Sequence, residues 1–182
     1  INLIQIRLYS MKRYLYRSII LLVVSSLFIC CDKMDDGKMI IPRALNIGDT
    51  IAFCAPAAPL DTTRMILAKN RLIEMGFYVV QSESLFRRWG YLAGSDSLRA
   101  DELMVFFQDP TIKAIFPGTV GYVTTRILDL LDYTIIRNNP KIFIGFSDIT
   151  GLHIALNQIA NLVTFHTPNP MSVSYTTSPS PR

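Results

Sequence analysis

The chain has 182 residues, half of them hydrophobic, with 18 Lys and Arg against 14 Asp and Glu and a net charge of +4. The four basic residues that precede Asp32 have no acidic counterpart, so the rest of the chain holds fourteen charges of each sign. A nucleic-acid partner needs a basic patch on the folded domain, and this balance predicts none. Cys54 is the only cysteine after residue 31, which excludes a disulfide framework and any cysteine-based metal spacing. We expect no metal and no cofactor.

The N-terminal segment has the order of a secretory signal. Met11 opens a basic stretch at 12–17, an apolar run follows at 18–29, and Cys30 and Cys31 end it. The run is shorter than the ~20 apolar residues that a spanning helix needs, and the pattern is typical of an export signal. We therefore expect 1–31 to be a leader and signal peptide and 32–41 a polar tether.

The end of this signal, LFICC at 27–31, resembles a loose bacterial lipobox, in which a cysteine is lipidated and becomes the first mature residue. Cys31 fits that role better than Cys30, because a smaller residue precedes it. An ordinary cleaved signal and an uncleaved anchor are the alternatives. The lipobox predicts a lipoprotein of the bacterial cell envelope, held in the periplasm or outer membrane by lipid on Cys31.

Strand and helix patterns then alternate along the chain. Residues 50–55 form an apolar run that indicates a buried strand, and 63–75 carry an apolar face that Gly76 ends, made of Met65, Ala68, Leu72 and Met75. A second strand is expected at 78–81, a helix capped by Ser95 at 95–107, and a third strand at 113–116. A short helix at 124–131 and a fourth strand at 141–144 follow.

The last helix is predicted at 149–159, with an apolar face made of Ile149, Leu152, Leu156 and Ile159, and a fifth strand at 163–165. Such alternation predicts an α/β fold, a parallel sheet flanked by helices on both faces. We expect one domain over 42–171, and a disordered tail over the Ser-, Thr- and Pro-rich residues 172–182. Ligands of such folds bind at the carboxyl ends of the strands.

Gly145, Phe146, Ser147 and Asp148 stand between the fourth strand and the last helix. A tight Gly-x-Ser turn from strand to helix is the setting of a nucleophile elbow, which raises the serine Oγ above the sheet edge. An ordinary N-cap serine is the alternative. The second glycine of G-x-S-x-G is absent, because Ile149 occupies its place.

These residues, with several others, resemble the LD-carboxypeptidase family of serine peptidases, which trim murein tetrapeptides and include microcin-processing relatives. The longest matching run is NPKIFIGFSDITGLH at 139–153. Shorter ones are LNIGDTI at 45–51, AP at 55–56, YLAGSD at 91–96 with Arg99, GY at 121–122, TRILDLLDY at 125–133 and TFH at 164–166. The resemblance implies an αβα sandwich whose serine nucleophile is Ser147.

The resemblance also implies an oxyanion site and a substrate. The backbone N–H groups of Asp148 and of Gly121, or else Val120, would stabilise the oxyanion. The implied reaction removes the terminal D-amino acid from murein tetrapeptides. A non-catalytic muropeptide-binding lipoprotein and a hydrolase of another acyl or peptide conjugate remain alternatives, and a homodimer stays open.

The chain departs from the family pattern in two places. The loop that usually reads RGGYG is TVGYV at 119–123, and the usual His-Gly-Pro is His166, Thr167 and Pro168. The family places the Glu and His of its Ser-Glu-His triad in a second, β-rich domain, and no residue here inherits those roles. We expect His153 to be packed or on the surface, and His166 to have a structural or substrate-contact role. We expect this chain to be a truncated form that lacks the Glu and His of the triad. Because a serine without a base is a weak nucleophile, the activity of this chain alone stays open.

Overall fold

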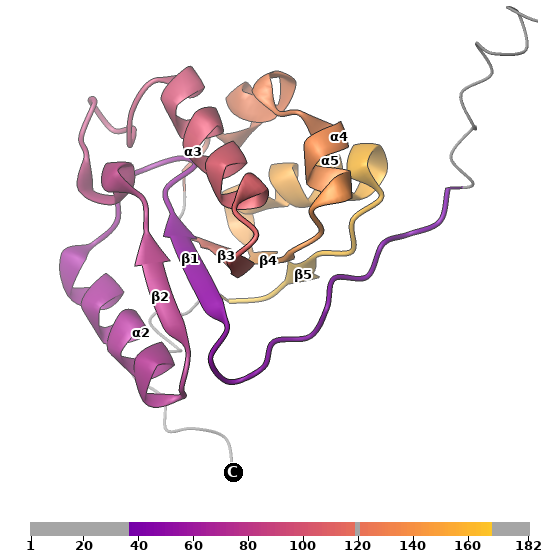
Figure 1. The fold of residues 1–182 in the computed structure, drawn as a ribbon. Helices are drawn as coiled ribbons and strands as arrows, with labels where there is room; N and C mark the ends of the chain where they lie inside the picture. The colour runs from indigo at the N-terminus through magenta and orange to yellow at the C-terminus, as the bar shows by residue number, and fades with distance from the viewer. Residues whose placement is uncertain (1–36, 119–120, 169–182) are drawn as a thin grey trace, which may run out of the picture. The chain divides into compact units, whose positions relative to one another are not determined.

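The structure, a computed structural model, describes residues 37–118 and 121–168. Within these residues five parallel strands form one sheet in the order β2-β1-β3-β4-β5 (Figure 1). β1 therefore lies between β2 and β3, and the chain runs outward from it in both directions. The strands are β1 Thr50–Cys54, β2 Tyr78–Gln81, β3 Ile112–Pro117, β4 Ile142–Gly145 and β5 Phe165–His166.

Four α-helices and three 3₁₀-helices connect the described strands. They are α2 Thr62–Glu74, η1 Glu83–Phe86, α3 Asp96–Gln108, η2 Thr124–Leu130, α4 Tyr133–Asn138, η3 Ser147–Ile149 and α5 Thr150–Ala160. The sequence analysis predicted neither η1 nor α4, and the short helix expected at 124–131 is the 3₁₀-helix η2. Among the residues that the structure covers, none of the helices has the length and apolar character to cross a membrane.

Side-chain caps explain where several helices begin. Ser95 accepts a hydrogen bond from the Leu98 N–H at 3.3 Å, which confirms the predicted cap of α3. Asp61 accepts one from the Arg64 N–H at the start of α2. Each cap satisfies a backbone donor that the first helical turn leaves free.

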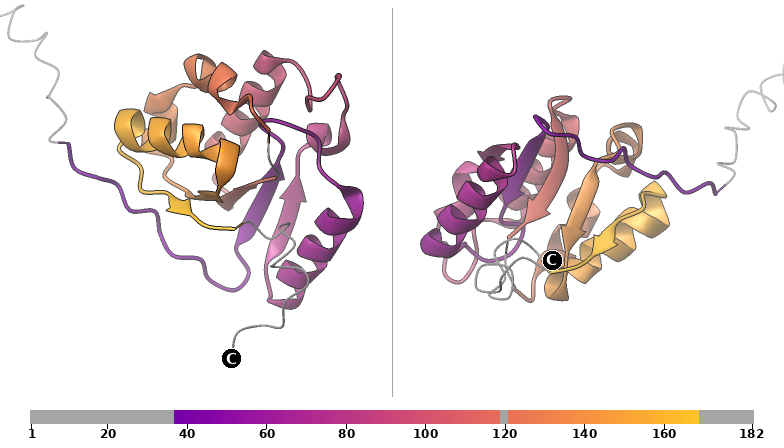
Figure 2. Two further views of the ribbon diagram at one scale, coloured as in Figure 1. Left: turned by 180° about the vertical axis from the view of Figure 1, so that it is seen from behind. Right: turned by 90° about the horizontal axis from the view of Figure 1, so that it is seen from below.

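Helices cover both faces of the sheet, which confirms the predicted fold class. On one face α3, α4 and α5 pack against the sheet in a cluster that includes Leu103, Phe107 and Phe143 (Figures 1 and 2). On the other face α2 packs through Met65, Ala68 and Leu72. Hydrophobic burial on both sides explains why β1 reads as a nearly continuous apolar run.

Two residues assigned to buried helical faces are exposed instead. Met75 follows the last residue of α2 as its C-cap, so it leaves the buried face and is 51% exposed. In the last turn of α5 the buried position is Ala160, while Ile159 is 58% exposed. The edge strand β2 is also largely exposed, because only one neighbour flanks it.

Candidate active site

Ser147 follows β4 at the carboxyl edge of the sheet. Phe146 has extended backbone angles, and Ser147 then adopts φ +59° as the first residue of η3, which leads into α5. A left-handed conformation in a non-glycine residue costs ~1–3 kcal/mol and persists where the surrounding fold enforces it. The Ser147 residue is exposed. The expected strand–turn–helix elbow is present, while the role of Ser147 as nucleophile stays a prediction.

The neighbours of Ser147 explain how the tight turn packs. A Cβ built on Gly145 would lie 2.7 Å from Cγ2 of Ile149, closer than side chains tolerate. Ile149 itself is 1% exposed and belongs to the core. The residue that replaces the second glycine of G-x-S-x-G therefore anchors the elbow by burying its side chain, and Gly145 leaves room for it.

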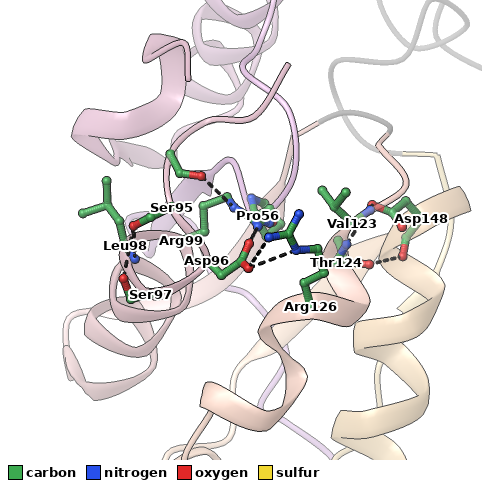
Figure 3. A network of polar contacts seen from close by, with 11 residues as sticks. Pro56, Ser95, Asp96, Ser97, Leu98, Arg99, Val123, Thr124, Arg126 and Asp148 are labelled. Carbon is green, nitrogen blue, oxygen red and sulfur yellow. Dashed lines mark hydrogen bonds and ion pairs between the residues drawn. The ribbon is translucent and has the colours of Figure 1, made fainter. Parts of the chain in front are cut away.

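The Asp148 side chain contacts the start of η2, an earlier part of the chain (Figure 3). Its Oδ2 accepts hydrogen bonds from the backbone N–H groups of Val123 and Thr124, both at 3.1 Å. The Thr124 Oγ1 donates to the Asp148 carbonyl at 2.5 Å. Sequence reasoning assigned only the backbone N–H of Asp148 and missed these side-chain contacts.

Gly121 lies in the same neighbourhood. A Cβ built on Gly121 would approach the Asp148 Oδ2 to 3.2 Å and the Ala57 Cβ to 2.6 Å. The structure thus places Gly121 near the Asp148 carboxylate and beside the loop that follows β1, while the oxyanion role of both residues stays a prediction. Val120, the alternative donor, and Cys31, the predicted lipidation site, lie outside the described residues.

His153 is buried, as expected of a packed side chain. Its Nε2 lies 3.0 Å from the carbonyl oxygen of Gly145 and its Nδ1 lies 2.8 Å from the Thr164 Oγ1. Since a carbonyl only accepts, the neutral ring with its proton on Nε2 satisfies both contacts. Burial lowers the pKa of His153, with the Gly145 hydrogen bond opposing that shift and His166 adding to it. His153 therefore braces the elbow rather than facing outward.

His166 ends β5 opposite Gly145 in the sheet register. It is exposed, and its ring centroid is 5.8 Å from that of His153. The strand pairing places His166 beside the elbow, which keeps the predicted structural or substrate-contact role open.

A buried arginine holds the loop after β1. The Arg99 guanidinium, fully buried, donates to the carbonyl oxygens of Gly94 and Pro56 and pairs with the Asp96 carboxylate. Asp96 also binds Arg126 of η2 at 2.7 Å, so one carboxylate lies between two guanidinium groups (Figure 3). The spacing of Asp96 and Arg99 on one helix could have suggested their pairing, but nothing local indicated Pro56 as a partner.

No group of three His, Cys, Asp or Glu side chains suited to a metal ion occurs within residues 37–118 and 121–168. Cys54 is buried, and desolvation raises the pKa of its thiol above the usual range.

Comparison with known proteins assigns the family. The sequence profile of the LD-carboxypeptidase N-terminal domain matches residues 51–167. The chain belongs to the LD-carboxypeptidase family. It is 44% identical over 127 residues to the "Probable murein peptide carboxypeptidase" of Bacillus subtilis, a match covering 70% of this chain and 40% of that protein.

Solved structures agree with the family assignment. An MccF-like protein from Bacillus anthracis superposes with a TM-score of 0.71 at 35% identity, over 76% of this chain and 43% of that one. A muramoyltetrapeptide carboxypeptidase from Oxalobacter formigenes gives 0.63 at 28% identity, over 70% and 42%. The chain thus spans less than half the length of these LD-carboxypeptidase relatives.

Proposed function

We propose that this chain carries the nucleophile of a serine-type LD-carboxypeptidase, which removes the terminal D-amino acid from murein tetrapeptides during peptidoglycan recycling or remodelling. The observation that carries the proposal is the conformation of Ser147, an exposed serine with φ +59° at a strand-to-helix turn. The murein substrate is supported by the name of the Bacillus subtilis relative.

In the proposed reaction the Ser147 Oγ attacks the carbonyl carbon of the bond before the terminal D-residue. The N–H groups of Asp148 and Gly121 would donate to the oxyanion that forms, the interaction that lowers the barrier of acyl transfer. A base must take the serine proton, and an acid must protonate the departing amine. The buried His153 has both ring nitrogens engaged, so it fits neither task.

We therefore expect the isolated chain to have little or no carboxypeptidase activity. The family supplies Glu and His from a second domain, and joining such a domain to this chain should restore turnover. Release of D-alanine from a murein tetrapeptide is the measurement, with Ser147→Ala as the comparison. Robust turnover by the chain alone, abolished by Ser147→Ala, would refute the need for a second domain and make His166 the first candidate base. Turnover of the joined protein that survives Ser147→Ala would refute the nucleophile.

A second substrate class is also open, because an MccF-like protein is among the solved structures that this chain resembles. In this alternative the same serine would hydrolyse a microcin-type acyl or peptide conjugate. Profiling the joined protein on an LD-linked tetrapeptide and on an acyl-nucleotide conjugate separates the two. Tight binding of muropeptide without turnover of either compound would instead support the non-catalytic binding lipoprotein.

We also propose that lipid on Cys31 anchors the protein in the bacterial cell envelope. Two acyl chains anchor a protein stably, whereas one binds a membrane only marginally. The expected result is partition into detergent that Cys31→Ala abolishes. Unchanged processing and membrane retention of Cys31→Ala would favour an uncleaved anchor. The homodimer is a further prediction, which sedimentation of the detergent-solubilised protein tests.

A further inference from the structure

The side chain of Asp148 supplies the start of η2 with its hydrogen-bond acceptor. Val123, the N-cap residue of η2, has no side-chain acceptor, and η2 shows no side-chain cap from its own N-cap residue. The first two N–H groups, those of Val123 and Thr124, belong to residues that are 6% and 0% exposed. A buried donor without a partner is costly, and the Asp148 Oδ2 is the partner of both.

The segment that Asp148 holds begins two residues after Gly121. The backbone at Gly121 lies so close to Asp148 that a Cβ there would be 3.2 Å from Oδ2. A third bond, from the Thr124 Oγ1 to the Asp148 carbonyl, connects the same two segments through the main chain of the elbow. Three hydrogen bonds therefore connect the start of η2, two residues after Gly121, to the residue directly after Ser147.

The Arg99 network does not duplicate this connection. Arg126 anchors the middle of η2 to Asp96, and Arg99 anchors Pro56, the neighbour of Ala57 (Figure 3). These contacts hold η2 and the loop after β1 against α3. Among the hydrogen bonds between described residues that involve Val123 or Thr124, those to Asp148 are the ones that reach the elbow.

We propose that Asp148 is a positioning residue whose carboxylate sets the distance between the two backbone donors of the oxyanion site. This inference rests on the proposed function. One residue would then serve twice, because its N–H faces the developing charge and its side chain holds the other donor, Gly121, in place. Preorganised donors of this kind need no rearrangement as the charge forms.

The test uses the form of the protein that releases D-alanine, this chain alone or joined to the second domain of the family. Asp148→Ala removes the acceptor, and we expect kcat to fall by ~10²-fold, the range found when one oxyanion donor is lost. KM should change little, since the affected contacts form in the transition state. Asp148→Asn keeps an acceptor of the same size without the charge, and it should restore most of kcat.

Asp132 provides a matched control. Its Oδ1 accepts hydrogen bonds from the Thr134 and Ile135 N–H groups at 2.9 and 3.0 Å, so it caps α4 in the same way and is not part of the elbow. Asp132→Ala should lower the melting temperature as Asp148→Ala does, yet leave kcat unchanged. An equal fall of kcat in both variants would show general destabilisation and overturn the proposal.

Amide hydrogen exchange of this chain itself gives a readout without catalysis. The N–H groups of Val123 and Thr124 should exchange faster in Asp148→Ala and at the parent rate in Asp132→Ala. Parent exchange rates in Asp148→Ala would overturn the positioning role. If Ser147→Ala abolishes turnover while Asp148→Ala keeps the parent kcat, the proposed function stands and the positioning role alone fails. If turnover survives Ser147→Ala, the proposed function itself fails.

Discussion

The polar residues at the two ends of β4 differ in burial and in backbone strain. Lys141 precedes the strand and is 5% exposed, and its Nζ donates to the carbonyl oxygens of Asp109 and Ile112 at 2.6 and 2.7 Å. Ser147 follows the strand, is exposed and adopts a strained φ of +59°. Both residues belong to the same 15-residue run that resembles the LD-carboxypeptidases.

The difference separates Lys141, whose contacts stabilise the fold, from Ser147, which we propose as the nucleophile. At the amino end every contact of the Lys141 amine lies inside the protein, and burial, with the nearby Lys113, lowers the pKa of Lys141 to about 8. At the carboxyl end the backbone is strained and the side chain faces outward, where ligands of parallel sheets bind. One matching run can therefore contain both a buried structural residue and the exposed serine that we propose as the nucleophile.

The largest expected effect on stability is at the amino end. Lys141→Met should lower the free energy of unfolding by about 2 kcal/mol, because it removes two charge-assisted hydrogen bonds from the buried amine to backbone carbonyl oxygens. Urea denaturation followed by circular dichroism measures it. Lys113→Met is the control, since the hydrogen bond of the Lys113 amine, to the carbonyl oxygen of Pro110, is exposed, and it should change stability by less than about 0.5 kcal/mol. Equal losses in both variants would contradict a specific role for the buried amine.

At the carboxyl end a substitution should stabilise the protein. Ser147→Gly should raise the free energy of unfolding by about 1 kcal/mol, because glycine adopts φ +59° without strain, while removing the proposed nucleophile. Ser147→Ala should give no such gain, since alanine keeps the Cβ. Asn161, at φ +51°, is the other described non-glycine residue with positive φ. Asn161→Gly should gain less, because asparagine tolerates this conformation. A loss of stability in Ser147→Gly would contradict the strained elbow.

The smallest expected effect is the pH dependence of stability that comes from His153, the buried residue beside the elbow. Burial lowers the pKa of His153 in the folded protein, so the unfolded state binds a proton first as pH falls. The His153 contribution to stability should therefore decline as pH falls below the ordinary histidine value of about 6.5. The change in unfolding free energy between pH 7 and 5 should be smaller in His153→Gln than in the parent. His166→Gln should alter this change less, because the neighbouring His166 ring is a smaller cause of the His153 shift than burial is. If the unfolding free energy of the parent and of His153→Gln depended on pH identically, His153 would have the same pKa in the folded and unfolded states, which would contradict this prediction.

Much of the fold was predictable, because its signals are local. The apolar run at Thr50–Cys54 and the Ser95 cap of α3 each depend on neighbouring residues, and both appear where expected. The prediction that Met75 and Ile159 lie on buried helical faces was wrong, because it too depended on local signals alone. Helical spacing shows which residues share a face, but it cannot show where another element stops covering that face.

The sequence by itself determined the alternation of five strands with the helices α2, α3 and α5, the family and the place of Ser147 after β4, since spacing and propensity act within a few residues. Only the tertiary structure decided the contacts that connect distant segments. Asp148 binds Thr124, 24 residues earlier, and Arg99 binds Pro56, 43 residues earlier. The physical reason is that parallel strands bring the loops at their carboxyl ends to one edge. Which side chains meet there depends on the completed sheet, because no segment contains both partners of such a bond.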